Sequence, residues 1–269
     1  MNRLPSGNLM LLAQRTMSNI STNMIEIFSS IQGEGMLVGL RQAFLRFHGC
    51  TMNCYYCDTR SSYSSPAPEF CQVEKLPGRQ DFYSVRNPLS FKYILDLLNE
   101  WQQALPKAHH SISLTGGEPL LHVESLQRLL PDLRTILPVY LETNGVLFHE
   151  LTQCIDSIDY ISMDFKLPST TKSREYWKEH LKFLEIANQS NVYVKTVVSS
   201  ETTVCEIKKA CDVIASVNKN VPLILQPVTT ISPDEAISSL LLLELQEAAS
   251  ELVSEVRIIP QTHKYLNLL

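Results

Sequence analysis

The chain has 269 residues, of which 44% are hydrophobic, so it can build one large core or two small ones. Its 28 aspartates and glutamates outnumber 23 lysines and arginines, and the formal net charge of −5 gives no global attraction for a nucleic-acid backbone. No apolar run approaches the roughly 18 residues that cross a membrane. We therefore expect neither nucleic acid nor a membrane as a direct partner.

The N-terminal segment differs from the rest of the chain. Residues 1–25 contain no acidic residue, a composition that a weak transit peptide shares. We favour a simpler interpretation, in which translation starts at Met17 or Met24 and the preceding residues form a loose tail. The prediction is an extension over residues 1–23, followed by a single domain over 24–269.

Alternating strand and helix patterns begin at Met24. We predict strands at 25–28, 43–47, 111–114, 139–141, 158–162, 192–198, 223–226 and 256–259. We predict helices at 90–101, 126–133, 176–189, 202–216 and 233–252, the first capped by Ser90 and the last by a capping box at Ser232 to Glu235. Residues 60–88 are rich in serine and proline without a period, which indicates an inserted loop.

This alternation implies a parallel sheet with right-handed crossovers. About six strand–helix units are present, fewer than a closed eight-fold barrel requires, so the predicted fold is α/β, an incomplete (β/α)6-type TIM barrel. Each candidate functional loop follows a strand, where parallel α/β folds place their sites. Seven of the nine glycines lie in or beside these loops and none follows Gly145, which indicates that the N-terminal half builds most of the site.

The cysteines predict a metal site in a reducing compartment such as the cytoplasm. Seven is an odd number, and three of them form the pattern Cys50-x-x-x-Cys54-x-x-Cys57. Three thiolates can hold an iron–sulfur cluster and leave one iron open for a small molecule. The alternative is a structural zinc with His48 or Cys71 as the fourth ligand. The cysteines at 71, 154, 205 and 211 are expected to pack as small hydrophobic residues.

The cysteine pattern, with Tyr56 before the third cysteine, resembles the signature of the radical S-adenosylmethionine (SAM) superfamily. The resemblance implies a 4Fe-4S cluster on the three cysteines, with SAM on the open iron. Thr115-Gly116-Gly117-Glu118-Pro119 resembles the superfamily's glycine-rich segment, and Glu142-Thr143-Asn144-Gly145 its segment near the ribose. The residues implied to bind SAM are Tyr56, Gly117, Glu142, Thr143, Asn144, Lys166 and Ser169. Lys166 and Ser169 could instead cap the end of a strand.

From Met24 to Asn267 the chain is similar to the 7-carboxy-7-deazaguanine synthase family. The segments that carry this similarity are Ile31 to Gly35 (IQGEG), Arg46, Cys57 to Thr59, Lys166 to Ser169 and Pro260 to Lys264 (PQTHK). The resemblance implies a carbon–nitrogen lyase that contracts 6-carboxy-5,6,7,8-tetrahydropterin with loss of ammonia, on the route to queuosine, a tRNA modification. It also implies Mg²⁺, an electron donor such as flavodoxin or ferredoxin, and a homodimer.

The substrate residues that the resemblance implies are Ile31, Gln32, Gly33, Glu34, Arg46, Thr115 and His263. Arg46 can bind a carboxylate through two hydrogen bonds, although a salt bridge at the strand edge is the alternative. Gln32 and Glu34 offer a donor and an acceptor that match the guanidine-like edge of a pterin. Alternatively, they only stabilise the turn around Gly33 and Gly35. A lone histidine near a C-terminus is usually a surface residue, but because His263 lies within the PQTHK segment we expect it to contact the substrate.

Thr59 matches the family's magnesium ligand, and Asp58 is either a second candidate for that role or a helix cap. The chain ends Asn267-Leu268-Leu269, so we do not predict the contact that a C-terminal proline carboxylate makes in family members. Two other functions stay open from the sequence: an activase for a glycyl-radical enzyme, and a non-catalytic zinc-binding module.

Overall fold

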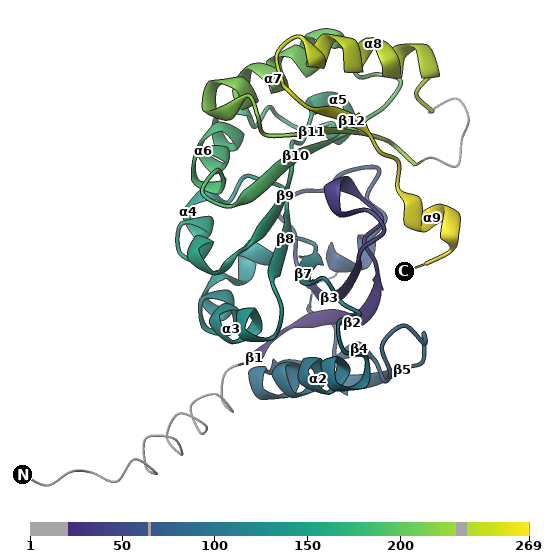
Figure 1. Cartoon of the computed structure of the whole chain (residues 1–269), viewed down its shortest axis with the longest axis vertical. Helices are drawn as coiled ribbons and strands as arrows, with labels where there is room; N and C mark the ends of the chain where they lie inside the picture. The colour runs from purple at the N-terminus through teal and green to yellow at the C-terminus, as the bar shows by residue number, and fades with distance from the viewer. Residues whose placement is uncertain (1–20, 64–65, 230–235, 269) are drawn as a thin grey trace, which may run out of the picture.

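The computed structural model describes residues 21–63, 66–229 and 236–268 (Figure 1). Most of the predicted N-terminal extension, including Met17, therefore lies outside the described residues. The short strand β1 (Ser21–Thr22) pairs with β6 (Leu89–Ser90), and the main sheet begins with β2 (Met24–Ile31). None of the helices described in this structure is long and apolar enough to cross a membrane.

One sheet of ten strands organises the described part of the chain, in the order β12-β11-β10-β9-β8-β7-β3-β2-β4-β5. Neighbours from β3 to β12 pair in parallel, while β2 is antiparallel to β3. The sheet is not closed, which confirms the incomplete barrel. Its strands are β2, β3 (Arg41–Phe47), β4 (Phe70–Glu74), β5 (Phe82–Arg86), β7 (Ser111–Gly116), β8 (Val139–Thr143), β9 (Tyr160–Asp164), β10 (Asn191–Val198), β11 (Leu223–Pro227) and β12 (Val256–Ile258).

Helices cover the convex face of this curved sheet (Figure 1). They are α2 (Phe91–Ala104), α3 (Val123–Ile136), α4 (Phe148–Leu151), α6 (Trp177–Ala187), α7 (Val204–Asn218) and α8 (Ser239–Ser250). The Ser90 hydroxyl accepts a hydrogen bond from the Tyr93 N–H and caps α2, as predicted. Buried leucine, isoleucine and valine side chains from the strands and these helices form one continuous core.

Two predictions need correction. Residues 60–88 contain the antiparallel pair β4–β5, and β4 joins the sheet through Glu26↔Gln72 and Ile27↔Val73. This pairing partner lies more than forty residues away, so local composition gave no sign of it. The last long helix, α8, begins at Ser239 and is capped by the Ser238 hydroxyl. The capping box predicted at 232–235 lies outside the described residues.

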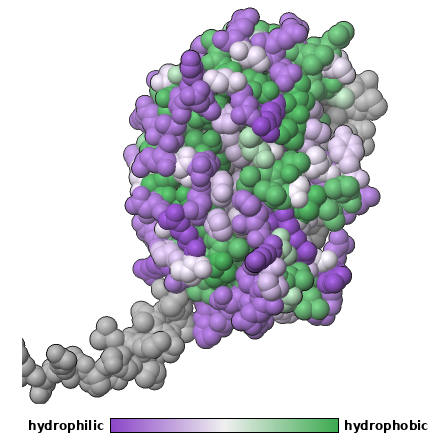
Figure 2. Space-filling model, viewed as in Figure 1, coloured by the Kyte–Doolittle hydropathy of each residue, from purple (hydrophilic) through white to green (hydrophobic). Residues whose placement is uncertain are grey.

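The molecular surface mixes residue types: Figure 2 shows hydrophobic side chains interspersed with hydrophilic ones over the face in view. Leu240 and Leu243 of α8 are among the large hydrophobic side chains that are exposed. Cys205, in the first turn of α7, is also exposed, so the prediction that it packs in the core is wrong. Cys71, Cys154 and Cys211 are buried, as expected.

Candidate active site

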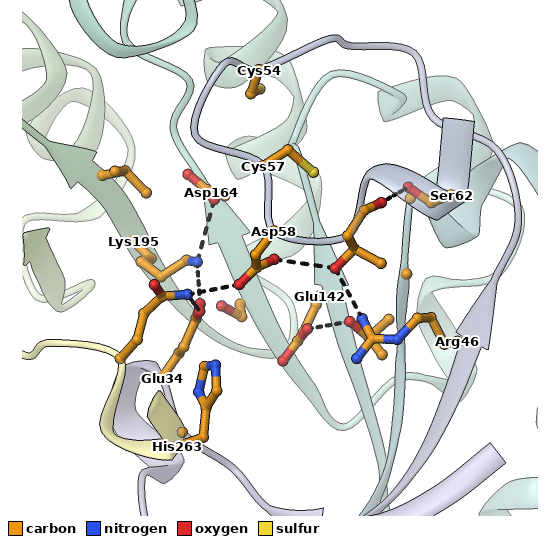
Figure 3. Close-up of a pocket in the computed structure, with 18 of the residues that line it drawn as sticks. Glu34, Arg46, Cys54, Cys57, Asp58, Ser62, Glu142, Asp164, Lys195 and His263 are labelled. Atoms are coloured by element: carbon orange, nitrogen blue, oxygen red, sulfur yellow. Dashed lines mark hydrogen bonds and ion pairs between the residues drawn. The ribbon is translucent and has the colours of Figure 1, made fainter. Parts of the chain in front are cut away.

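A cavity of about 470 Å³ lies at the carboxyl ends of the parallel strands (Figure 3). Its lining comes from the 31–35 loop, the cysteine loop after β3, the loops after β7 and β8, the ends of β9, β10 and β11, and the segment that carries α9 (Thr262–Leu266). The residues after Gly145, which include no glycine, thus contribute charged side chains to the cavity. Most of the lining residues nevertheless lie in the N-terminal half, in agreement with the expectation from the glycine distribution.

Cys50, Cys54 and Cys57 all line this cavity, and the Cys57 N–H donates to the Cys54 carbonyl at 3.1 Å. Burial raises the pKa of the Cys50 and Cys54 thiols, so a bound metal has to supply the positive charge that keeps them as thiolates. Cys71 lies in the hydrophobic core on β4, away from the lining of the cavity, and is not placed as a fourth ligand. Three thiols from one loop that line the same cavity match the donor set of an iron–sulfur cluster.

The glycine-rich loop after β7 presses directly against the cysteine loop. A Cβ on Gly117 would lie 1.8 Å from the Gly49 carbonyl oxygen, and that oxygen accepts the Glu118 N–H at 2.7 Å. Glu118 in turn accepts hydrogen bonds from the Thr143 hydroxyl at 2.9 Å and the Asn144 N–H at 2.8 Å. Burial raises the pKa of Glu118 to about 7 despite these donors. The loops after β3, β7 and β8 therefore form one hydrogen-bonded unit.

Glu142 lies at the base of the cavity between two neutral donors. The Thr115 hydroxyl donates to one of its oxygens at 2.5 Å, and the Gln32 amide donates to the other at 2.7 Å. The same Gln32 amide donates to Gln42 at 3.0 Å, and its carbonyl accepts the Glu34 N–H at 2.9 Å. Gln32 is 2% exposed and its polar atoms are already paired within the protein. Its observed role is therefore to hold Glu142 and the 31–35 loop.

Arg46 combines both alternatives that the sequence left open. Its Nε donates to Glu26 at 2.6 Å, its guanidinium lies 5.4 Å from the centre of the Phe28 ring, and it also lines the cavity. The Thr59 hydroxyl is 3.5 Å from the guanidinium and donates to Asp58 at 3.1 Å. A cation paired on one edge and open on another can still bind a substrate carboxylate.

The C-terminal segment crosses the mouth of the cavity and is bound to two other loops. The Thr262 N–H donates to the Gly33 carbonyl at 2.8 Å, and Lys264 pairs with Asp58 at 3.0 Å. Burial opposes the ionisation of Asp58, but Lys264 outweighs it and the pKa falls to about 2. His263 is half-buried against Gly33, where a Cβ would lie 2.0 Å from the imidazole Nδ1. The motifs at the two ends of the domain therefore meet at one site.

Comparisons with known proteins agree with this arrangement. The sequence pattern of the radical SAM superfamily matches residues 44–213. The chain is 49% identical over 253 residues to the 7-carboxy-7-deazaguanine synthase of Geobacter sulfurreducens, covering 94% of this chain and 100% of that one. The chain belongs to the 7-carboxy-7-deazaguanine synthase family. The enzyme of the same name from Methanocaldococcus jannaschii is 32% identical, covering 91% of this chain and 99% of that one.

Among solved structures, the fold is similar to the crystal structure of QueE from Escherichia coli. The TM-score is 0.61 at 21% identity, and the match covers 93% of this chain and 98% of that one. The family and superfamily use a 4Fe-4S cluster and SAM, and the three cysteines of the cavity are the ligands that fit such a cluster. Gly117 lies so close to the Gly49 carbonyl that no side chain would fit between the glycine-rich loop and the cysteine loop.

Most residues that the family resemblance implied meet at this cavity. Ile31, Gln32, Gly33, Glu34, Arg46, Tyr56, Thr59, Thr115, Gly117, Glu142, Thr143, Asn144, Lys166 and His263 all line it. Ser169 does not: it lies in α5 (Pro168–Thr171), where its N–H donates to Glu206 at 3.0 Å and its hydroxyl contacts Thr202 at 3.3 Å. The Ser169 hydroxyl is directed toward Thr202, just before α7, and not into the cavity, so Ser169 is left out of the SAM contacts proposed below.

Two buried charged residues of the cavity were missed. Asp164 binds Lys166 at 2.7 Å, and Lys195 binds Glu34 at 2.5 Å and Asp164 at 3.3 Å. Lys195 interrupts an apolar strand, Val192 to Val198, and a lysine in such a strand must find anionic partners. This interruption was the signal that could have identified it.

Proposed function

We propose that this chain is a radical SAM carbon–nitrogen lyase that converts 6-carboxy-5,6,7,8-tetrahydropterin to 7-carboxy-7-deazaguanine with loss of ammonia, in queuosine or related deazapurine biosynthesis. The observation that carries the proposal is convergence: the cysteine loop, the loops after β7 and β8, the IQGEG loop and the PQTHK segment all line one cavity. The identity of 49% with a 7-carboxy-7-deazaguanine synthase over nearly the whole chain supports the same assignment.

In this proposal Cys50, Cys54 and Cys57 hold the 4Fe-4S cluster and leave one iron for SAM. When bound, the cluster and SAM would supply the 5′-deoxyadenosyl radical needed to remove hydrogen from the pterin carbon bearing the carboxylate. The residues proposed to contact SAM are Tyr56, Gly117, Glu142, Thr143, Asn144 and Lys166. The buried ammonium of Lys166 suits a carboxylate ligand, although Asp164 already partners it at 2.7 Å.

The proposed contacts with the substrate depend mainly on charged side chains. Arg46 binds the pterin carboxylate on the guanidinium edge that Glu26 leaves open. Thr59, whose hydroxyl is 3.5 Å from that guanidinium, is our candidate ligand for a Mg²⁺ ion bound with the substrate. Glu34 and Glu142 present carboxylate oxygens to the ring N–H groups, and His263 packs over Gly33 at the mouth. Because these groups are largely buried, their electrostatic interactions with the substrate are stronger than in water.

The two other functions considered from the sequence lack comparable support. A glycyl-radical activase would share the cysteine loop but has no use for IQGEG and PQTHK segments that meet at the same cavity. A zinc module needs a fourth ligand, and in the described residues no three histidine, cysteine, aspartate or glutamate side chains are grouped as for a single metal ion. The proposal also includes a homodimer, a flavodoxin or ferredoxin as electron donor, and a cytoplasmic single-domain protein with an N-terminal extension.

The decisive experiment is an anaerobic assay of the reconstituted protein with the tetrahydropterin, SAM, Mg²⁺ and dithionite. We expect 7-carboxy-7-deazaguanine, identified by mass and ultraviolet absorbance, and released ammonia in equal amount. Cys54→Ala should abolish both, whereas the exposed Cys205→Ala should not. No product from wild-type protein with full iron and sulfide content would reject the substrate assignment.

A further inference from the structure

A chain of polar contacts crosses the cavity and both begins and ends in the cysteine loop. Its members, in order, are Tyr56, Lys166, Asp164, Lys195, Glu34, Gln261 and Asp58. Consecutive members are joined by hydrogen bonds or ion pairs of 2.5–3.3 Å. In Figure 3, Lys195 lies between Asp164 on one side and Glu34 on the other. Lys195 is therefore the link between the cofactor side and the substrate side.

The two carboxylates that contact Lys195 depend on it to different degrees. Asp164 has a second cation, because Lys166 lies 2.7 Å from the same Oδ2 atom. Glu34 has only Lys195 as an ion-pair partner among the described residues, and its other oxygen accepts the Gln261 amide at 2.6 Å. Removal of the Lys195 charge would thus leave Asp164 paired and Glu34 without a cation.

The contacts of Glu34 fix its orientation. One oxygen is bound to Lys195 from β10 and the other to Gln261 from the C-terminal segment, so the carboxylate plane is held from two elements. Each oxygen keeps a further lone pair, and Glu34 lines the cavity. A carboxylate that is already fixed loses little conformational entropy when it accepts N–H groups from a ligand.

We propose that Lys195 is a positioning residue for the pterin, which acts by holding the Glu34 carboxylate in place to accept the N–H groups of the guanidine-like ring edge. This inference rests on the proposed function. Lys195 itself need not touch the substrate, since its ammonium is bound to two carboxylates and only 9% of the residue is exposed. The role predicts that the effect of Lys195 on substrate binding passes entirely through Glu34.

The first test compares Lys195→Met and Lys195→Arg with a matched control, Lys208→Met. Lys208 is an exposed lysine on α7 that pairs with Glu251 at 2.9 Å, so the control also removes one ion pair. Tetrahydropterin affinity is measured by anaerobic equilibrium dialysis, and KM and kcat with dithionite as reductant. We expect Lys195→Met to weaken binding about tenfold or more, with KM rising more than kcat falls. Lys195→Arg should recover part of the affinity, and the control should match wild type.

The second test is a double-mutant cycle with Glu34→Gln. If Lys195 acts through Glu34, then Glu34→Gln/Lys195→Met binds the pterin as tightly as Glu34→Gln alone. The double variant removes one charge of each sign and leaves Asp164 paired with Lys166. It can therefore still be compared with Glu34→Gln if Lys195→Met alone does not fold. Wild-type affinity in Lys195→Met, or losses that multiply in the double variant, would overturn the inference. Failure of wild-type turnover in the same series would instead reject the proposed function.

Discussion

Replacement of Gly117 by alanine tests whether the glycine-rich loop must touch the cysteine loop. The new Cβ would lie 1.8 Å from the Gly49 carbonyl oxygen and 3.1 Å from the Cβ of Cys50. Close carbon–oxygen contacts are about 3.3 Å, so the two backbones must separate by about 1.5 Å. This movement would break the hydrogen bond from the Glu118 N–H to Gly49 and displace the first cluster ligand.

The expected cost has two parts. Overpacking against a backbone costs about 1–3 kcal/mol, and loss of the buried hydrogen bond about 1 kcal/mol more. The total of about 2–4 kcal/mol is a large fraction of the 5–15 kcal/mol that typically stabilises a domain. Urea unfolding of the cluster-free protein measures this loss, and iron and sulfide analysis after anaerobic reconstitution measures whether the displaced loop still holds a cluster.

Gly39→Ala is the matched control. Gly39, unlike Gly117, has a left-handed backbone, with φ of +87°, but a Cβ there would meet no atom within 4 Å. We expect it to lose about 1–2 kcal/mol from backbone strain alone and to keep full iron content and the wild-type KM for SAM. If Gly117→Ala also kept both, the close approach of the two loops would have no role in cofactor binding.

Three further changes have expected outcomes. Arg46→Lys should raise the KM for the tetrahydropterin about tenfold in steady-state assays, because lysine cannot make a bidentate contact while it also pairs with Glu26. Gln32→Ala should weaken the same binding step by freeing Glu142, and unchanged KM would show that Thr115 alone suffices to hold it. Burial lowers the pKa of His109 to about 4, so the folded state does not take up the proton that the unfolded chain binds near pH 6.5. The contribution of neutral His109 to the free energy of unfolding is fully present above that pH and is lost as the pH drops toward 4, by about 1.4 kcal/mol near pH 5.5. His109→Gln should abolish this part of the pH dependence, which urea titrations at two pH values would measure.

The sequence predicted those parts of the site in which the chemistry is local. Cys50, Cys54 and Cys57 lie on one loop, and the segments at 115–119 and 142–145 each follow a strand, so spacing and order were sufficient. The barrel was also predictable, because buried parallel strands alternate with amphipathic helices. Within 60–88, by contrast, β4 forms by pairing with β5 and β2, and no local period marks it.

Electrostatic partners were not predictable for the same reason. Lys195 and Glu34 are 161 residues apart, and Gln261 is 227 residues from Glu34, so only the closed fold brings them into contact. Gln32 also has partners that the local sequence could not reveal. Its amide suited a pterin edge on chemical grounds, yet in the folded chain Gln42 and Glu142 already accept its hydrogen bonds. A polar residue next to a buried strand end often has its hydrogen bonds satisfied by other residues of the protein before any ligand binds.

This use of Gln32 changes how the cavity recognises a ligand. Two of the carboxylates that line it have different environments: Glu34 is bound to the cation of Lys195, whereas Glu142 accepts hydrogen bonds only from the neutral donors Gln32 and Thr115. Burial opposes ionisation of both, but Lys195 outweighs it and lowers the pKa of Glu34, while burial and the nearby charge of Glu34 raise that of Glu142. Two adjacent buried carboxylates can therefore coexist without both carrying a full charge. The cavity presents one firmly ionised acceptor beside a second carboxyl group that retains a proton more readily, and this asymmetry depends on a lysine that the sequence places in an otherwise apolar strand.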